Sequence, residues 1–104
     1  MSVVTLDGRP IQVNEEGFLT DPGEWDEGLA KALAALIGIT LTDEHWKAIR
    51  FLRDDFAAQG ETATLRRVST RGGIPVKQLF ALFPQKPAKK MAYVSGLPKP
   101  QGCV

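Results

Sequence analysis

The chain has 104 residues, 43% hydrophobic and 24% charged, which suits one small globular domain with a single core. The formal net charge of +1 excludes a strong overall attraction to nucleic acid or to a membrane surface. No apolar run approaches the ~20 residues of a membrane span, and residues 1–7 lack the basic start and long apolar stretch of a signal peptide. The single cysteine cannot form an internal disulfide, so we expect a cytoplasmic protein whose thiol stays reduced.

The first elements in chain order are a β-hairpin and a helix. Two short β-rich runs, residues 3–6 and 11–13, flank Asp7-Gly8-Arg9-Pro10, in which Asp-Gly is typical of a hairpin turn. We expect the first helix to have Asp21 as its N-cap and Pro22 at its first position, and to end at Gly38. Its apolar stripe consists of Trp25, Leu29, Ala32, Leu33, Leu36 and Ile37.

Four further helices are expected, each bounded by a capping residue, a glycine or a proline. They cover residues 42 to about 60, 62 or 64 to 71, 75–83, and 87–94. The longest has an apolar stripe of Trp46, Ile49, Leu52 and Phe56, and its polar residues Arg50, Arg53, Asp54 and Asp55 fall largely on the other face. We assign a structural role to His45 in its first turn, because no second His or nearby Cys could share a metal with it.

These elements predict a mainly α (α+β) fold, an orthogonal helical bundle with a small N-terminal β-hairpin. Residues 1–95 are expected to form the domain, and residues 96–104 a flexible, mobile C-terminal arm. Between residues 64 and 84, two short helices surround Gly72-Gly73 in a helix-turn-helix-like pattern.

The helix-turn-helix-like segment leaves a DNA-binding regulator open as an alternative function. It resembles the DNA-binding segment of TetR-type repressors. Phosphate contacts would come from Arg66, Arg67, Arg71 and Lys77, and base contacts from Lys77 and Gln78. The low net charge argues against this function.

The most distinctive feature is the position of the only cysteine, Cys103, in the Pro/Gly-rich C-terminal arm. A thiol on such an arm suggests a carrier, loaded with a chemical group at one protein and unloaded at another. Residues expected to form the arm or to guide it and its partner are Gly96, Leu97, Pro98, Lys99, Pro100, Gly102, Arg66 and Lys89. Nothing in the chain supplies a base, a metal site or a cofactor site, so we expect a carrier rather than a stand-alone enzyme.

The same tail resembles the C-terminus of the DsrC/TusE family. The residues that carry the resemblance are Phe83-Pro84, Pro87-Ala88-Lys89, Gly96-Leu97-Pro98-Lys99-Pro100 and Gly102-Cys103-Val104. Upstream, Asn14-Glu15-Glu16-Gly17-Phe18-Leu19 and Leu41-Thr42-Asp43-Glu44-His45-Trp46 are also similar to the family, so the resemblance covers nearly the whole chain. Folds of this family themselves resemble a helix-turn-helix, which gives that segment an architectural explanation.

The resemblance implies a sulfur carrier, with a persulfide on Cys103. Ala92 stands where the sulfite-reductase branch has a second arm cysteine, and the loop at residues 38–40 is short, so the single-cysteine, TusE-like branch fits better. That branch implies relay partners, namely an upstream sulfurtransferase and a downstream tRNA thiolase that makes 2-thiouridine. The alternative is an accessory protein of dissimilatory sulfur metabolism, with a sulfite reductase-like complex as the partner.

Overall fold

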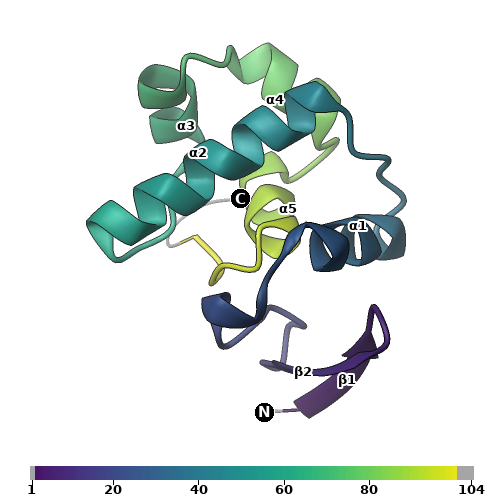
Figure 1. The fold of residues 1–104 in the computed structure, drawn as a ribbon. Coiled ribbons are helices and arrows are strands. Elements are labelled where there is room, and N and C mark those ends of the chain that lie inside the picture. The colour runs from purple at the N-terminus through teal and green to yellow at the C-terminus, as the bar shows by residue number, and fades with distance from the viewer. Residues whose placement is uncertain (1, 101–104) are drawn as a thin grey trace.

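The computed structural model describes residues 2–100, and Met1 and residues 101–104 lie outside this range. The elements are strands β1 (Ser2–Leu6) and β2 (Arg9–Val13), a 3-10 turn η1 (Pro22–Glu24), and helices α1 (Glu27–Leu36), α2 (Asp43–Gln59), α3 (Leu65–Gly72), α4 (Val76–Leu82) and α5 (Pro87–Val94). The helices pack at steep angles to one another, and the hairpin lies below α1 in Figure 1. This confirms the predicted mainly α fold with an N-terminal hairpin.

The hairpin turns at the predicted Asp-Gly pair, and its second strand begins two residues earlier than predicted, at Arg9. Leu6 pairs with Arg9 in the antiparallel register, which leaves Asp7 and Gly8 as the turn residues. Both have positive φ values, 53° and 73°, as a type I′ turn requires.

The first helix begins later than predicted. Asp21 caps only the single turn η1, through a hydrogen bond from Gly23 N, and α1 begins at Glu27 with Asp26 as its N-cap. Trp25 separates the two because its backbone is extended, with ψ at 142°. In this conformation its indole Nε1–H donates to the carbonyl oxygen of Val94 at 2.8 Å, a tertiary contact that overrides local helix propensity.

The remaining helices lie within a few residues of their predicted bounds, because their capping residues act as the sequence indicates. Thr42 and His45 form a capping box at the start of α2, and Gly60 ends α2 with φ at 77°. The Nε2–H of His45 also donates to the Leu82 carbonyl at 2.8 Å, so the predicted structural role of His45 is confirmed. No helix within residues 2–100 is long and apolar enough to cross a bilayer.

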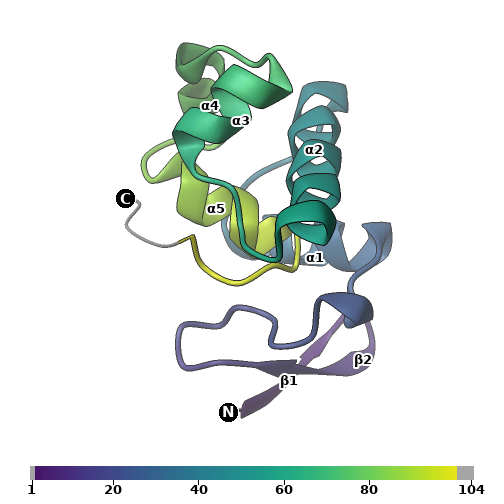
Figure 2. The ribbon, with the colours of Figure 1, turned by 90° about the vertical axis from the view of Figure 1, so that its left-hand side faces the viewer.

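Helix α5 lies at the centre of the bundle and contacts α1, α2 and α4 (Figure 2). Its buried residues are Pro87, Ala88, Met91, Ala92 and Val94. The larger hydrophobic cluster gathers around it, and a smaller cluster joins the hairpin to α1. Leu97, three residues beyond α5, is 1% exposed and belongs to the larger cluster.

Helix α5 ends in a Schellman motif. The amide of Leu97 donates to Ala92 O at 3.1 Å, the amide of Gly96 donates to Tyr93 O at 3.3 Å, and Gly96 has φ at 68°. A Cβ on Gly96 would lie 2.5 Å from Cδ1 of Trp25. Position 96 therefore needs glycine for two reasons, the left-handed backbone and the close approach of the indole.

The variant Gly96→Ala is expected to lower the free energy of unfolding by about 2–4 kcal/mol, from left-handed strain plus overpacking against Trp25. Gly60→Ala is the matched control, because Gly60 has φ at 77° but a Cβ there would meet no atom within 4 Å. The control should lose only about 1 kcal/mol. Urea denaturation measures both, and equal losses for the two variants would contradict the role given to Trp25.

Candidate functional site

The site predicted from the sequence centres on Cys103. Cys103 and Gly102 lie outside the described residues, so the structure places only the start of the predicted arm, residues 96–100. This segment runs between the helices and the N-terminal part of the chain, as the yellow ribbon in Figures 1 and 2 shows. Its described part lies against the domain, and the mobility expected of residues 96–104 stays a prediction.

Trp25 and Arg53 hold the backbone at the point where the arm begins. The indole of Trp25 donates to Val94 O, and the guanidinium of Arg53 donates to Ser95 O at 2.7 Å and to Pro22 O at 3.0 Å. The guanidinium carbon lies 4.1 Å from the centroid of the Trp25 ring, a cation–π contact. Burial lowers the pKa of Arg53 from its ordinary value. A cation at the C-terminus of α5 also complements the helix dipole.

Three further contacts continue along the segment. Leu97 is buried in the core, the Thr62 hydroxyl donates to Pro98 O at 2.7 Å, and Lys99 Nζ lies 3.2 Å from Glu16 Oε1. Thr62 is itself 8% exposed, so its hydrogen bond is shielded from water. The contacts weaken along the chain from a buried side chain to an ion pair between exposed groups.

A cleft of about 310 Å³ lies beside the segment. Its lining residues are Phe56, Gly60, Glu61, Thr62, Thr64, Pro98 and Lys99. Within residues 2–100 there is no cluster of three His, Asp or Glu side chains that could hold a metal ion. The described cleft therefore offers a surface beside the arm rather than a set of metal ligands.

The structure brings two of the three predicted guiding cations together. Lys89 Nζ and Lys99 Nζ lie 3.9 Å and 3.2 Å from the same oxygen, Oε1 of Glu16. Arg66 is exposed on α3, and no hydrogen bond or ion pair joins its side chain to residues 96–100. Lys89 and Lys99 thus share one carboxylate, while Arg66 stands apart from them.

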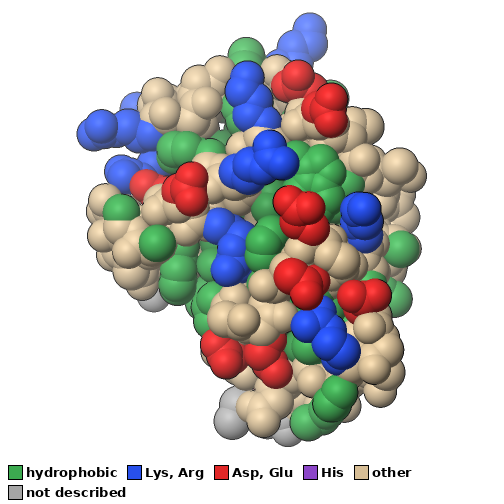
Figure 3. All heavy atoms as spheres, in the orientation of Figure 1, with side chains coloured by type: hydrophobic (Ala, Val, Ile, Leu, Met, Phe, Trp, Pro, Cys, Tyr) green, Lys and Arg blue, Asp and Glu red, His purple; other side chains and the backbone are tan. Residues whose placement is uncertain are grey.

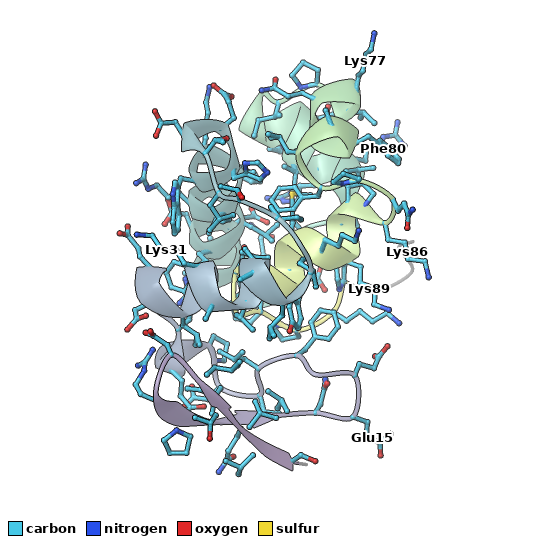
Figure 4. All side chains as sticks on the ribbon, turned by 90° about the vertical axis from the view of Figure 1, so that its right-hand side faces the viewer. Glu15, Lys31, Lys77, Phe80, Lys86 and Lys89 are labelled. Carbon is cyan, nitrogen blue, oxygen red and sulfur yellow. The ribbon has the colours of Figure 1, made fainter. Side chains whose placement is uncertain are left out.

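The two short helices of the predicted helix-turn-helix-like segment are present as α3 and α4, but two of its expected DNA-contacting side chains have internal partners. Arg67 makes three hydrogen bonds of 2.8–3.0 Å to the carboxylate of Asp55, and these bonds raise the pKa of the Arg67 guanidinium. Gln78 donates to Glu44 Oε2 at 2.8 Å. Phe80, labelled on α4 in Figure 4, is 47% exposed, whereas a helix that reads bases presents polar side chains.

Charge is also distributed without one dominant sign on the face shown in Figure 3. Lys and Arg side chains alternate there with Asp and Glu side chains, which agrees with the net charge of +1. A DNA-binding surface concentrates basic residues on one face, and the face in Figure 3 shows no such concentration. This view therefore gives no support to DNA binding.

Sequence reasoning missed Arg53, Thr62 and Glu16 as residues that hold the arm. Arg53 was expected on the polar face of the longest helix, but it is partly buried and faces Trp25. The spacing of Arg53 could have indicated its partial burial, because Arg53 follows Ile49 by four residues and so shares a helix face with that apolar residue. Thr62 and Glu16 carried no comparable signal.

Comparison with known proteins gives consistent matches over the full chain. A family model described as DsrC like protein matches residues 5–104. Sulfurtransferase TusE of Escherichia coli (strain K12) is 32% identical over 111 residues, which span 98% of this chain and 100% of that protein. A chain in the crystal structure of dissimilatory sulfite reductase I (DsrI) superposes with a TM-score of 0.85 at 35% identity, covering 99% of this chain and 100% of that chain. The NMR structure of Allochromatium vinosum DsrC gives 0.82 at 35% identity, covering 98% and 97%.

The variant Thr62→Val removes the hydroxyl but keeps the branched shape of the side chain. We expect it to lower the free energy of unfolding by about 0.5–1.5 kcal/mol, because the hydrogen bond to Pro98 O is lost. Hydrogen exchange at the Leu97 amide should also become faster. Thr62→Ser, which keeps the hydroxyl, is the control and should retain slow exchange, and slow exchange in Thr62→Val would show that this bond does not hold the arm.

Proposed function

Because the chain belongs to the family of DsrC like proteins, we propose that it is a sulfur carrier that holds sulfane sulfur as a persulfide on Cys103. It accepts the sulfur from an upstream sulfurtransferase and donates it to a downstream acceptor in a cytoplasmic relay. The curated relative TusE is named a sulfurtransferase, which supports this role. The acceptor pathway that we propose is synthesis of 2-thiouridine in tRNA.

One structural observation carries the proposal, namely the anchoring of the arm up to Lys99. Arg53, Thr62 and Glu16 contact the segment at Ser95, Pro98 and Lys99. Cys103 follows Pro100 by three residues, and three extended residues span at most about 11 Å. The anchored segment therefore limits the surface from which the thiol is presented to a partner.

The transfer step needs no oxidant and no cofactor. The thiolate of Cys103 attacks the outer sulfur of a donor persulfide, a new S–S bond forms at Cys103, and the S–S bond of the donor breaks. The donor leaves as a thiolate, and the proton of its outer sulfur stays with the transferred atom. The step causes no net oxidation or reduction, because one sulfane sulfur moves from the donor cysteine to Cys103.

The absence of a second cysteine from the sequence favours the tRNA branch over the sulfite-reductase branch. Ala92 stands at the position of the second arm cysteine, and it is fully buried in α5. A persulfide on Cys103 consequently has no second cysteine in the chain to attack it and form an intramolecular disulfide. It keeps its sulfur until a thiol or an acceptor of a partner arrives.

The alternative acceptor is a complex of dissimilatory sulfur metabolism. It is favoured by the superposition with a chain of dissimilatory sulfite reductase I at a TM-score of 0.85. Sulfur carriage on Cys103 is common to both pathways, so the two differ only in the partner that receives the sulfur.

Incubation with a persulfidated sulfurtransferase is expected to add one sulfur atom to the wild-type chain, because Cys103 is its only thiol. Intact mass spectrometry measures the gain, and reductant should remove it. Cys103→Ser should gain nothing. A folded wild-type chain that takes up no sulfur from protein or inorganic polysulfide donors would contradict the proposed function.

The acceptor pathway is tested in the organism that encodes the chain. Deletion of the gene should lower the 2-thiouridine content of its tRNA, measured by liquid chromatography and mass spectrometry of nucleosides. The wild-type gene should restore the content, and the Cys103→Ser gene should not. An unchanged 2-thiouridine content, with sulfur uptake intact, would favour the dissimilatory pathway instead.

A further inference from the structure

A second surface, the α5 lysine groove, lies next to the arm. It is a groove of about 340 Å³ at the start of α5, with walls from Lys86, Lys89 and Lys90. Its floor contains the apolar side chains of Phe18, Ile37 and Tyr93, and Glu16 stands at its edge. Phe18 is buried and packs edge-to-face on Tyr93 with ring centroids 5.6 Å apart, so the floor is rigid.

The charges of the α5 lysine groove are unbalanced within the described residues. Three lysines face one carboxylate, that of Glu16, which lies 3.9 Å from Lys89. Lys90 donates to the Pro84 carbonyl at 2.6 Å, a contact that holds the side chain without cancelling its charge. The groove therefore has a net positive potential over an apolar floor.

The same lysines are unfavourable for the local stability of α5. No acidic residue lies in the first turn of α5, although acidic side chains stabilise a helix N-terminus and basic ones oppose its dipole. Lys86 is the N-cap, and Lys89 and Lys90 follow within the next turn. Departures from local preference are expected where a surface serves binding, because the local cost is offset by a gain elsewhere.

We propose that the α5 lysine groove docks an acidic segment of the relay partner, in which large apolar side chains are flanked by carboxylates. The inference rests on the proposed function, since it identifies the partner by its chemistry. The carboxylates pair with Lys86, Lys89 and Lys90, and an apolar side chain packs on Tyr93 and Ile37.

An acidic protein segment suits this surface better than RNA. The groove contains no exposed flat aromatic ring for base stacking, because Phe18 is 1% exposed and Tyr93 is half-buried. An apolar floor ringed by lysines matches an apolar side chain ringed by acids.

The α5 lysine groove is joined to the arm through Glu16. The Oε1 atom of Glu16 contacts Lys89 in the groove and Lys99 in the arm, at 3.9 Å and 3.2 Å. A partner seated in the groove consequently lies beside the segment that leads to Cys103. Docking there places the partner next to Lys99, on the segment that precedes Cys103 in the sequence.

The test uses the full chain with Cys103→Ser, labelled with ¹⁵N, so that sulfur chemistry does not interfere. The probes are capped hexapeptides of sequence Glu-Asp-X-X-Glu-Asp, with X as Leu, Ile, Met or Phe, added at low ionic strength where ion pairs are weakly screened. Amide shifts should concentrate on Lys86, Lys89, Lys90 and Tyr93. Charge reversal at Lys86 or Lys90 should weaken binding about three- to tenfold.

Matched controls separate specific docking from general attraction. Lys31→Glu and Lys77→Glu make the same charge change at exposed sites that lie away from Lys86 and Lys89 in Figure 4, and they should change affinity less than twofold. Peptides with X as Ser keep the charge and should bind about tenfold more weakly, because they lose the apolar contact.

Three results would overturn the inference: no shift from any peptide of the panel, equal losses for the control and groove variants, or tighter binding of hexauridine than of the peptides. The outcome is separable from that of the proposed function. Peptide binding without sulfur uptake by the wild-type chain contradicts only the carrier function. Sulfur uptake without peptide binding contradicts only the docking groove.

Discussion

The guanidinium of Arg53 joins three segments that are far apart in the sequence. It extends from α2, donates to Pro22 O before α1 and to Ser95 O after α5, and stacks on Trp25. Burying a cation is unfavourable unless hydrogen bonds replace its water, and here two carbonyls and an aromatic face do so. Removal of the guanidinium would take a donor from each carbonyl, and Pro22 O would keep only the backbone N–H of Trp25. The position at which the arm leaves the domain depends on this side chain together with Trp25, whose indole donates to Val94 O.

The domain and the arm contribute different properties to the proposed carriage of sulfur. The domain holds α5 in its core and fixes the start of the arm through buried contacts, whereas Cys103, the residue proposed to carry sulfur, follows Pro100 by three residues. Within residues 2–100 no side-chain cluster suited to metal-assisted chemistry is present. In the proposed function, Cys103 serves active sites that belong to partners, and the fold contributes position and recognition.

Local signals made most of the fold predictable from the sequence, and long-range contacts account for what was missed. The turn at Asp7-Gly8 and the caps at Thr42 and Gly60 depend on neighbouring residues alone, so their positions could be inferred. Trp25 and Arg53 depend on partners far away in the chain. The break before α1 exists because the Trp25 indole reaches Val94, 69 residues later, and no local pattern encodes that distance. The contact of Lys89 and Lys99 with the same carboxylate of Glu16 also could not be predicted from local sequence patterns.

The strength of the contacts around Glu16 suits a protein that must release its partner after each transfer. Lys89 and Lys99 both lie near Glu16 Oε1, and all three side chains are at least one-third exposed, at 35%, 41% and 46%. Ion pairs with this exposure contribute about 0–1 kcal/mol, equivalent to a factor of a few in an equilibrium constant. In the proposed docking, a partner carboxylate that pairs with Lys89 leaves Glu16 to pair with Lys99, which favours the attachment of the arm at Lys99. Each of these ion pairs contributes little free energy, so the proposed affinity is the sum of several weak contacts, and no single contact creates a large barrier to release of the partner.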